Sequence, residues 1–72
     1  MKVVIYGKPA CPFCDKAKMR LSKYNPKIFM LNKDFTREEF FQKFPNAKTF
    51  PQIMVDDTHV GGYTDLVSFI DD

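Results

Sequence analysis

The sequence predicts an α/β domain with the element order βαβαββα, in which three helices flank a four-stranded mixed sheet. Two observations carry this prediction. Apolar, β-branched runs at residues 2–6 and 28–31 enclose a segment with helical spacing, which indicates a βαβ unit with parallel strands and a right-handed crossover. Further along, two short strands enclose Asp56-Asp57, a pattern typical of a β-hairpin. We expect one domain, residues 1–72, near the lower size limit for a core without staples or metals.

Both cysteines lie at the start of the first predicted helix, which follows the first predicted strand. Residues 2–6 form a continuous apolar run, typical of a strand buried on both faces, and Gly7 ends it. A loop at residues 8–10 leads into a helix that Asn25-Pro26 should end. Residues at helical spacing along this helix are expected to form a core stripe: Phe13, Ala17, Leu21 and Tyr24.

The second helix and the hairpin follow the strand at residues 28–31. Thr36 and Glu39 have the spacing of a capping box, which predicts where the helix begins, and Pro45-Asn46 should end it. The hairpin strands are predicted at residues 53–55 and 58–60. The apolar side of the second helix is interpreted as core: Phe40, Phe41 and Phe44.

The last helix should follow a tight turn. Gly61-Gly62 permits that turn, and Thr64 is the expected N-cap. Three apolar residues lie along this helix: Leu66, Phe69 and Ile70.

Both cysteines lie in Cys11-Pro12-Phe13-Cys14. Proline has no N–H and a fixed φ, so Pro12 suits the first helical position and makes Cys11 the expected N-cap. The Cys11 sulfur would then lie beside unpaired N–H groups at the positive end of the helix dipole, which lowers the pKa of its thiol. We therefore expect Cys11 to be a nucleophile and Cys14, buried one turn along, to be the resolving thiol.

Three other interpretations of the cysteine pair compete. A structural disulfide is disfavoured, because closing so short a loop gives only about 2 kcal/mol. A zinc site usually has four ligands, and His59 is the only other common nitrogen or sulfur ligand, so no metal is predicted. His59 itself is expected to be an exposed polar residue beside the hairpin turn, without a catalytic role. Coincidental spacing of two core cysteines is the third alternative.

Charge is distributed unevenly along the chain. Residues 1–33 carry a net charge of +7 and residues 34–72 carry −5, so the half with the cysteines should attract anionic substrates. The alternative is that these lysines form an ordinary solvated helix face. Nucleic-acid binding is not expected, because no recognisable nucleic-acid motif accompanies the charge. No apolar run is long enough to span a membrane and no signal peptide is recognised, so we expect a cytoplasmic protein whose cysteine pair is catalytic.

Three separate segments together resemble the glutaredoxins, most of all the short dithiol glutaredoxins of bacteria and their viruses. These segments are Cys11-Pro12-Phe13-Cys14, Thr49-Phe50-Pro51-Gln52-Ile53 and Gly61-Gly62-Tyr63-Thr64-Asp65. The resemblance extends along the whole chain. It implies a thioredoxin-like fold in which Pro51 is cis and lies against the cysteine pair, so that the main chain of Phe50 can pair with a peptide-like substrate.

The resemblance also implies a binding site for glutathione. Lys8 would meet its glycine carboxylate, Phe50 would pair with its cysteine, and Thr64 and Asp65 would hold its γ-glutamyl end. Further residues expected at this site are Phe13, Thr49, Pro51, Gly62 and Tyr63.

The chain departs from the family at several positions. Phe13 stands where tyrosine is more frequent, and Phe50 stands where valine is common, which adds a ring at the rim of the site. The family's glutamine or basic residue on the second helix has no secure match, although Arg37 and Gln42 are candidates.

The predicted function is glutathione-dependent thiol–disulfide oxidoreduction on protein disulfides and glutathione mixed disulfides. Glutathione would be a co-substrate, no cofactor would be bound, and the chain would act as a monomer. The resemblance suggests ribonucleotide reductase as a client protein. Two alternatives are a redoxin recharged by thioredoxin reductase and a non-enzymatic iron–sulfur carrier, in which two chains and two glutathiones hold a cluster through Cys11. The rigid Pro12 argues against the carrier.

Overall fold

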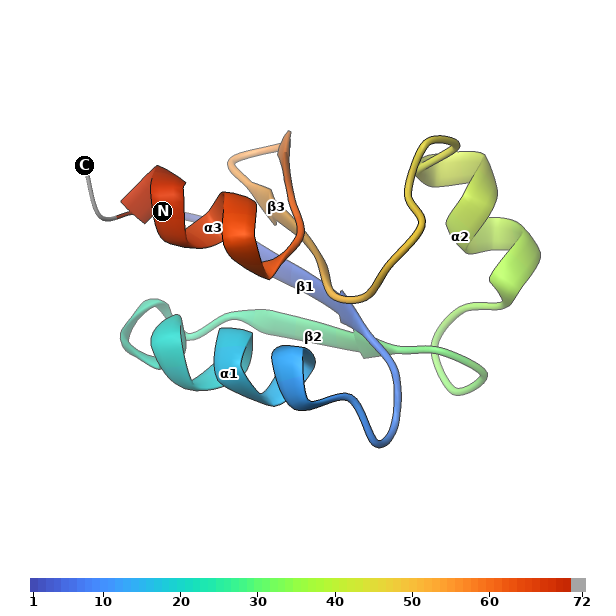
Figure 1. Ribbon diagram of the computed structural model, residues 1–72, viewed down its shortest axis with the longest axis horizontal. Coiled ribbons are helices and arrows are strands. Elements are labelled where there is room, and N and C mark those ends of the chain that lie inside the picture. The colour runs from blue at the N-terminus through green and yellow to red at the C-terminus, as the bar shows by residue number, and fades with distance from the viewer. Residues whose placement is uncertain (71–72) are drawn as a thin grey trace.

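A computed structural model describes residues 1–70, and it confirms the predicted mixed four-stranded sheet with three helices (Figure 1). The strand order is β2-β1-β3-β4. β1 pairs in parallel with β2 and antiparallel with β3, and β3 pairs antiparallel with β4. The elements are β1 (Val3–Gly7), α1 (Pro12–Arg20), the 3₁₀ helix η1 (Ser22–Tyr24), β2 (Lys27–Met30), α2 (Arg37–Lys43), β3 (Gln52–Val55), β4 (Thr58–Gly61) and α3 (Tyr63–Ile70).

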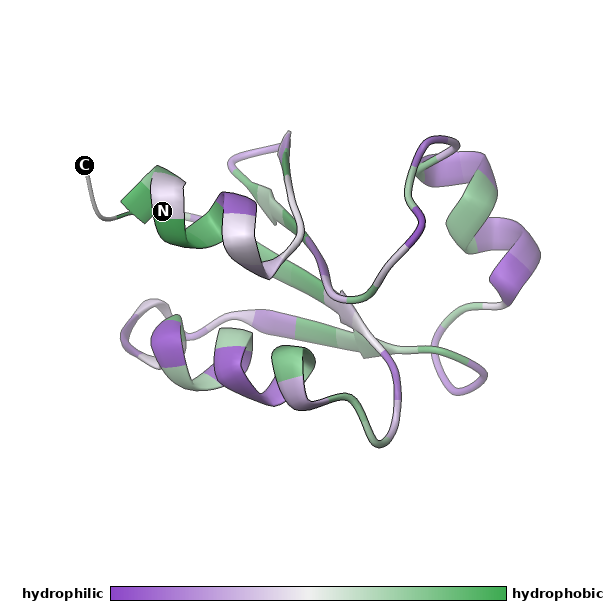
Figure 2. Ribbon diagram, in the orientation of Figure 1, coloured by the Kyte–Doolittle hydropathy of each residue, from purple (hydrophilic) through white to green (hydrophobic). Residues whose placement is uncertain are grey.

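One face of the sheet is covered by α1 and α3, which lie side by side (Figure 1). Alternate residues of β1 point to opposite faces, so Val3 and Ile5 enter this core while Val4 and Tyr6 face the other way. Figure 2 shows hydrophobic residues along β1 and α3. The buried residues of this core are Val3, Ile5, Ala17, Leu21, Ile53, Val55 and Leu66.

The other face carries an aromatic cluster under α2, which lies toward one end of the sheet (Figure 1). The Phe40 ring stacks on Phe50 with centroids 4.4 Å apart, and the Phe44 ring meets Tyr6 edge-on at 5.1 Å. The capping box predicted for α2 is confirmed, because Thr36 Oγ1 accepts from the Glu39 N–H and Glu39 Oε1 accepts from the Thr36 N–H. Phe41 is 40% exposed, so its predicted place in the core is wrong.

The predicted core stripe of the first helix is partly wrong. Ala17 and Leu21 are fully buried, but Phe13 is 52% exposed and Cys14 takes its place in the core. The reason is helical geometry: at 3.6 residues per turn, Cys14 lies only about 20° around the axis from Leu21, whereas Phe13 lies about 80° away. The helix also ends earlier than predicted, at Arg20, and η1 carries the chain on to Asn25, which has a left-handed φ of 53°.

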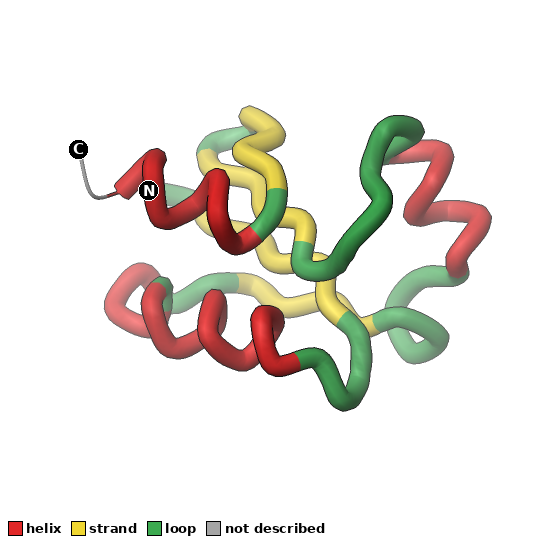
Figure 3. The backbone as a smooth tube through the Cα atoms, in the orientation of Figure 1, coloured by secondary structure: helices red, strands yellow, loops and turns green. Residues whose placement is uncertain are grey.

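The predicted β-hairpin is confirmed, because β3 and β4 pair antiparallel around Asp56 and Asp57. Asp56 and Asp57 both have positive φ, as a tight turn between antiparallel strands requires. A β-bulge interrupts the pairing between Ile53 and Met54, because Ile53 pairs with Gly61 while Met54 pairs with His59. Figure 3 shows the longer loop, residues 44–51, running from the end of α2 back to the start of β3. This loop reaches the cysteines.

Candidate active site

Cys11 is the N-cap of α1 and Pro12 is its first residue, as predicted. The two cysteines form a disulfide with Cα atoms 5.2 Å apart, and the Cys14 N–H points to the Cys11 Sγ at 3.2 Å. Cys14 is fully buried and Cys11 is 6% exposed, so Cys11 is the more accessible sulfur. Once the disulfide is reduced, the helix N-terminus favours the thiolate at Cys11.

Gly7 makes room for the buried sulfur. A Cβ at this position would lie 3.3 Å from the Cys14 Sγ, closer than most such contacts in proteins. The glycine that ends β1 therefore also allows the start of α1 to pack closely against the sheet.

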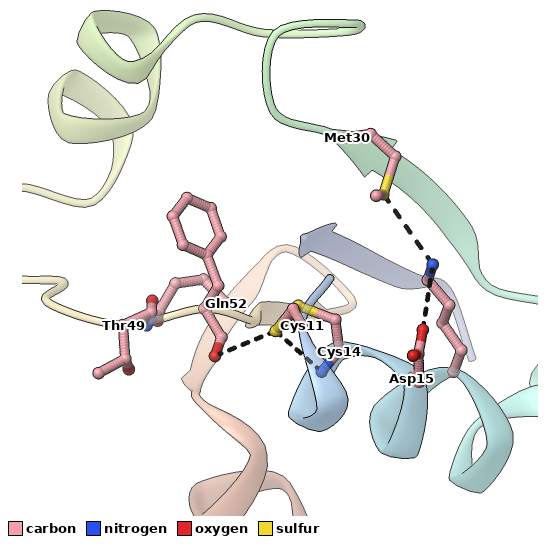
Figure 4. The surroundings of a disulfide bond; sticks show 8 residues. Cys11, Cys14, Asp15, Met30, Thr49 and Gln52 are labelled. Carbon is pink, nitrogen blue, oxygen red and sulfur yellow. Dashed lines mark hydrogen bonds and ion pairs between the residues drawn. A yellow bond between two sulfur atoms is a disulfide. The ribbon is translucent and has the colours of Figure 1, made fainter. Parts of the chain in front are cut away.

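The loop before β3 brings Phe50 beside the cysteine pair. The Phe50–Pro51 peptide bond is cis, as the resemblance implied, and Pro51 is fully buried. The Cys11 Sγ lies 3.9 Å from the carbonyl oxygen of Phe50 (Figure 4). Main-chain groups of the loop are thus within reach of whatever binds to the Cys11 sulfur.

A groove of about 480 Å³ lies between this loop, the start of α3 and the exposed Phe13 ring. The Phe13 ring lies 5.7 Å from the Tyr63 ring. The predicted site residues that line this groove are Phe13, Thr49, Phe50, Gly62, Tyr63, Thr64 and Asp65.

Two predicted site residues lie outside the groove lining. Pro51 is buried behind it. Lys8 is exposed on the loop before Cys11, with its Nζ 5.9 Å from the centroid of the Phe50 ring. That ring points into the aromatic cluster against Phe40 and does not stand free at the rim, contrary to the expectation from the family comparison.

The N-terminus of α3 forms one side of the groove. Its predicted cap is wrong: the helix begins at Tyr63, so Thr64 is its second residue. Asp65 Oδ2 accepts from the Gly62 N–H at 3.1 Å, so the third residue of the helix reaches back to the residue before it. The first N–H groups of a helix have no partners within it, which leaves them available to an anion in the groove.

Six further residues line the groove and were not predicted there: Asn46, Ala47, Lys48, Gln52, His59 and Gly61. Asn46, Ala47 and Lys48 line the groove because of the course of the loop, for which no local sequence signal exists. Gln52 is 5% exposed and bonds to the Thr49 carbonyl oxygen and to His59. A glutamine inside an otherwise apolar strand was the signal that could have identified it. His59 is exposed as expected, but its interaction with Gln52 was not foreseen.

A second hollow, of about 510 Å³, lies on the aromatic face between β2 and α2. It is lined by rings and by charged residues of α2, and it contains neither cysteine. Since the only sulfur nucleophiles lie elsewhere, we place the chemistry at the groove beside Cys11.

Residues 3–60 match the family model for glutaredoxin. The chain belongs to the glutaredoxin family. Glutaredoxin 1 of Rickettsia typhi is 41% identical over 76 residues, an alignment that covers 97% of this chain and 71% of the relative. The family and the cysteine pair together make this glutaredoxin a thiol–disulfide oxidoreductase.

Solved glutaredoxins share the fold. Glutaredoxin 1 of Francisella tularensis, crystallised with cacodylate, superposes with a TM-score of 0.81 at 30% identity, covering 97% of this chain and 92% of that one. A buckwheat glutaredoxin solved as a complex with glutathione has a TM-score of 0.76 at 17% identity, covering 92% of this chain and 64% of that one, which shows the shared fold. Among residues 1–70 no helix is long and apolar enough to cross a membrane.

Proposed function

We propose that this glutaredoxin reduces protein disulfides and glutathione mixed disulfides and is regenerated by glutathione, acting as a single-domain monomer in the cytoplasm. One observation carries the proposal: the Cys11 sulfur lies 3.9 Å from the Phe50 carbonyl oxygen, beside a groove lined by residues of the loop before β3 and of the start of α3. Such a groove suits an extended peptide with carboxylates at its ends.

The reaction begins with reduced protein. The Cys11 thiolate attacks one sulfur of the substrate disulfide, forming a mixed disulfide and releasing the other substrate sulfur as a thiolate, which takes up a proton. Cys14 then attacks the Cys11 sulfur, which frees the second substrate thiol and forms the Cys11–Cys14 disulfide. For a glutathione adduct on Cys11, a second glutathione thiolate can attack the glutathione sulfur instead, which forms glutathione disulfide and frees the Cys11 thiolate.

Glutathione would lie along the groove from Lys8 to α3. The Lys8 ammonium would attract its glycine carboxylate, and the Phe50 main chain would pair with its cysteine. Its γ-glutamyl carboxylate would meet N–H groups at the start of α3, near Thr64. A carboxylate has two oxygens, so Asp65 can cap α3 and also accept from the γ-glutamyl ammonium. Phe13 and Tyr63 would cover the peptide from the side.

A coupled assay tests the source of electrons. We expect NADPH oxidation through glutathione reductase and glutathione to sustain turnover on a glutathionylated substrate. Turnover that only thioredoxin reductase sustains would contradict the proposed use of glutathione. Ribonucleotide reductase is the proposed protein client, and deoxynucleotide formation with this protein as the electron donor tests it directly.

Anaerobic purification distinguishes the enzyme from an iron–sulfur carrier. The rigid Pro12 at the first position of α1 leaves little room for a cluster on Cys11. We expect colourless protein without iron. A stoichiometric brown chromophore would favour the carrier.

A further inference from the structure

Gln52 is the only buried polar side chain among residues 1–70. It is the first residue of β3 and follows Pro51 directly. Burying an amide is unfavourable unless its polar atoms find partners. The partners of Gln52 therefore indicate what the residue does.

Both ends of the amide are bonded. Gln52 Nε2 donates to the Thr49 carbonyl oxygen at 2.8 Å, and its Oε1 lies 2.7 Å from His59 Nε2 (Gln52 and Thr49 are drawn in Figure 4). A carbonyl oxygen can only accept, so the donor end of the amide must face Thr49 and its oxygen must face His59. It follows that His59 donates through Nε2.

His59 is itself held in place from β4. Its ring lies 4.5 Å from the Phe44 ring, and the Phe44 ring also contacts Tyr6, the residue of β1 that pairs with Gln52. Aromatic rings thus lie to both sides of the Gln52 amide. The hydrogen bonds from His59 to Gln52 and from Gln52 to Thr49 form a continuous chain from β4 to the active-site loop.

The last hydrogen bond of this series, from Gln52 to Thr49, fixes the orientation of one peptide unit. The Thr49 carbonyl and the Phe50 N–H belong to the same planar peptide, in which a trans bond makes the two groups point in opposite directions. Because Gln52 holds the carbonyl toward the sheet, the Phe50 N–H points away from it. A carbonyl that accepts a hydrogen bond also polarises the N–H of its own peptide unit.

We propose that Gln52 and His59 are positioning residues that orient the Thr49–Phe50 peptide so that the Phe50 N–H meets the backbone of the substrate disulfide. This inference rests on the proposed function, in which Phe50 pairs with glutathione. Both side chains also line the groove, and the role proposed here is exerted through the Thr49 carbonyl.

Gln52→Glu is the direct test. The substitution keeps an oxygen toward His59 but replaces the donor to Thr49 by an acceptor, which repels the carbonyl. We expect the KM for a glutathionylated peptide to rise roughly five- to tenfold, as for the loss of a well-oriented hydrogen bond. The kcat should stay near the wild-type value, because only binding is affected. The rate of Cys11 alkylation by iodoacetamide, which needs no pairing with Phe50, should also be unchanged.

Asn25→Asp is the matched control, since Asn25 is exposed at the end of η1 and the change from amide to carboxylate is the same. His59 supplies a second test, because it is exposed and its replacement should disturb the fold less than a replacement of the buried Gln52. His59→Phe keeps a ring against Phe44 but removes the donor, and we expect the KM to rise roughly two- to fivefold. His59→Gln, which can still donate to Gln52, should restore much of the wild-type KM.

Several results would overturn the inference. An unchanged KM in both Gln52→Glu and His59→Phe would exclude a positioning role. A parallel loss of kcat and of the Cys11 alkylation rate in Gln52→Glu would show that Gln52 only maintains the fold. A failure of His59→Gln to improve on the KM of His59→Phe would show that the hydrogen bond from His59 has no part in positioning the peptide. Turnover of wild-type protein with glutathione is measured first, because its absence would overturn the proposed function and this inference with it.

Discussion

Cys11 and Cys14 differ in both position and exposure. Cys11 caps the helix, whereas Cys14 is fully buried beneath it and its N–H points to the Cys11 sulfur. Because Cys14 is fully buried, a substrate can reach its sulfur only after local opening of the structure, whereas Cys11 keeps some exposure. The chemical roles of the two thiols should therefore separate in single-residue variants.

Cys11→Ser should abolish all turnover, because a serine hydroxyl stays protonated near neutral pH and cannot form the mixed disulfide. Cys14→Ser should keep most activity on glutathionylated substrates, since free glutathione can resolve that adduct, but lose most activity on a protein disulfide. Mass spectrometry after brief exposure to iodoacetamide should find Cys11 modified first. Alkylation of Cys14 first, or equal failure of both variants on glutathione mixed disulfides, would reverse the assignment.

Lys8→Glu should raise the KM for glutathione severalfold, because the exposed ammonium attracts a carboxylate across solvent and such exposed pairs contribute about 0–1 kcal/mol. Added salt should weaken binding to the wild-type protein more than to the variant. Lys23→Glu, an identical charge change in η1 beyond the other end of α1, is the control. Lys8 has no part in binding if the two variants behave alike.

At the scale of elements, α2 begins with a complete capping box. Thr36→Ala removes one side of it and should lower the free energy of unfolding by about 1 kcal/mol. Thr36→Ser keeps a hydroxyl and should stay within a few tenths of a kcal/mol of wild type, again as expected for an N-cap. Urea denaturation followed by circular dichroism measures both. Equal stability of all three proteins would mean that the box contributes nothing.

Local signals allowed much of the fold to be predicted. The capping box, the Asp56-Asp57 turn and the Pro12 helix start depend on neighbouring residues alone, and all three are present. The family's motifs led to the cis Phe50–Pro51 bond and to the residues of the groove.

The wrong predictions concern contacts that form only on folding. Helical spacing predicts Phe13 in the core stripe, but the phase of the helix gives that position to Cys14. Thr64 is predicted as the N-cap of the last helix, but that helix begins one residue earlier, at Tyr63, and the Asp65 carboxylate accepts from the Gly62 N–H. Phe50 was expected at the rim, yet the course of the loop turns its ring into the cluster with Phe40. The outcome for Phe13 depends on the phase of the helix, that for Thr64 on a choice between neighbouring caps, and that for Phe50 on contacts between segments far apart in the sequence.

At the scale of the whole molecule, much of the stability should come from the aromatic cluster. Phe40→Ala should lower the free energy of unfolding by about 3–5 kcal/mol, because the ring is buried and stacks on Phe50. Phe41→Ala, the next residue in the same helix, should cost less than about 1 kcal/mol, since its ring is 40% exposed. Denaturant titration compares them. Similar losses of unfolding free energy for the two variants would show that the aromatic cluster contributes no more to stability than an exposed ring does.

The uneven charge of the chain should affect encounter rates. Reduced protein should react with the anionic disulfide 5,5′-dithiobis(2-nitrobenzoate) severalfold faster at low than at high ionic strength, because salt screens the attraction to the basic half. The neutral reagent 4,4′-dithiodipyridine should react at a rate nearly independent of salt. Stopped-flow absorbance measures both rates. Identical salt dependence for the two reagents would rule out steering.

The two edge strands of the sheet, β2 and β4, have features that oppose self-association of the protein. β2 and β4 are the edge strands, which other sheets could join edge to edge, although both main-chain groups of Met30 in β2 are already bonded within the following turn. Both are only four residues long; β2 begins with the exposed Lys27, and the bulge opposite Ile53 and Met54 disturbs the regular spacing of β4. Short length, an edge charge and a bulge all oppose the addition of a further strand. The bulge next to His59 therefore also helps to protect the sheet from growing into aggregates.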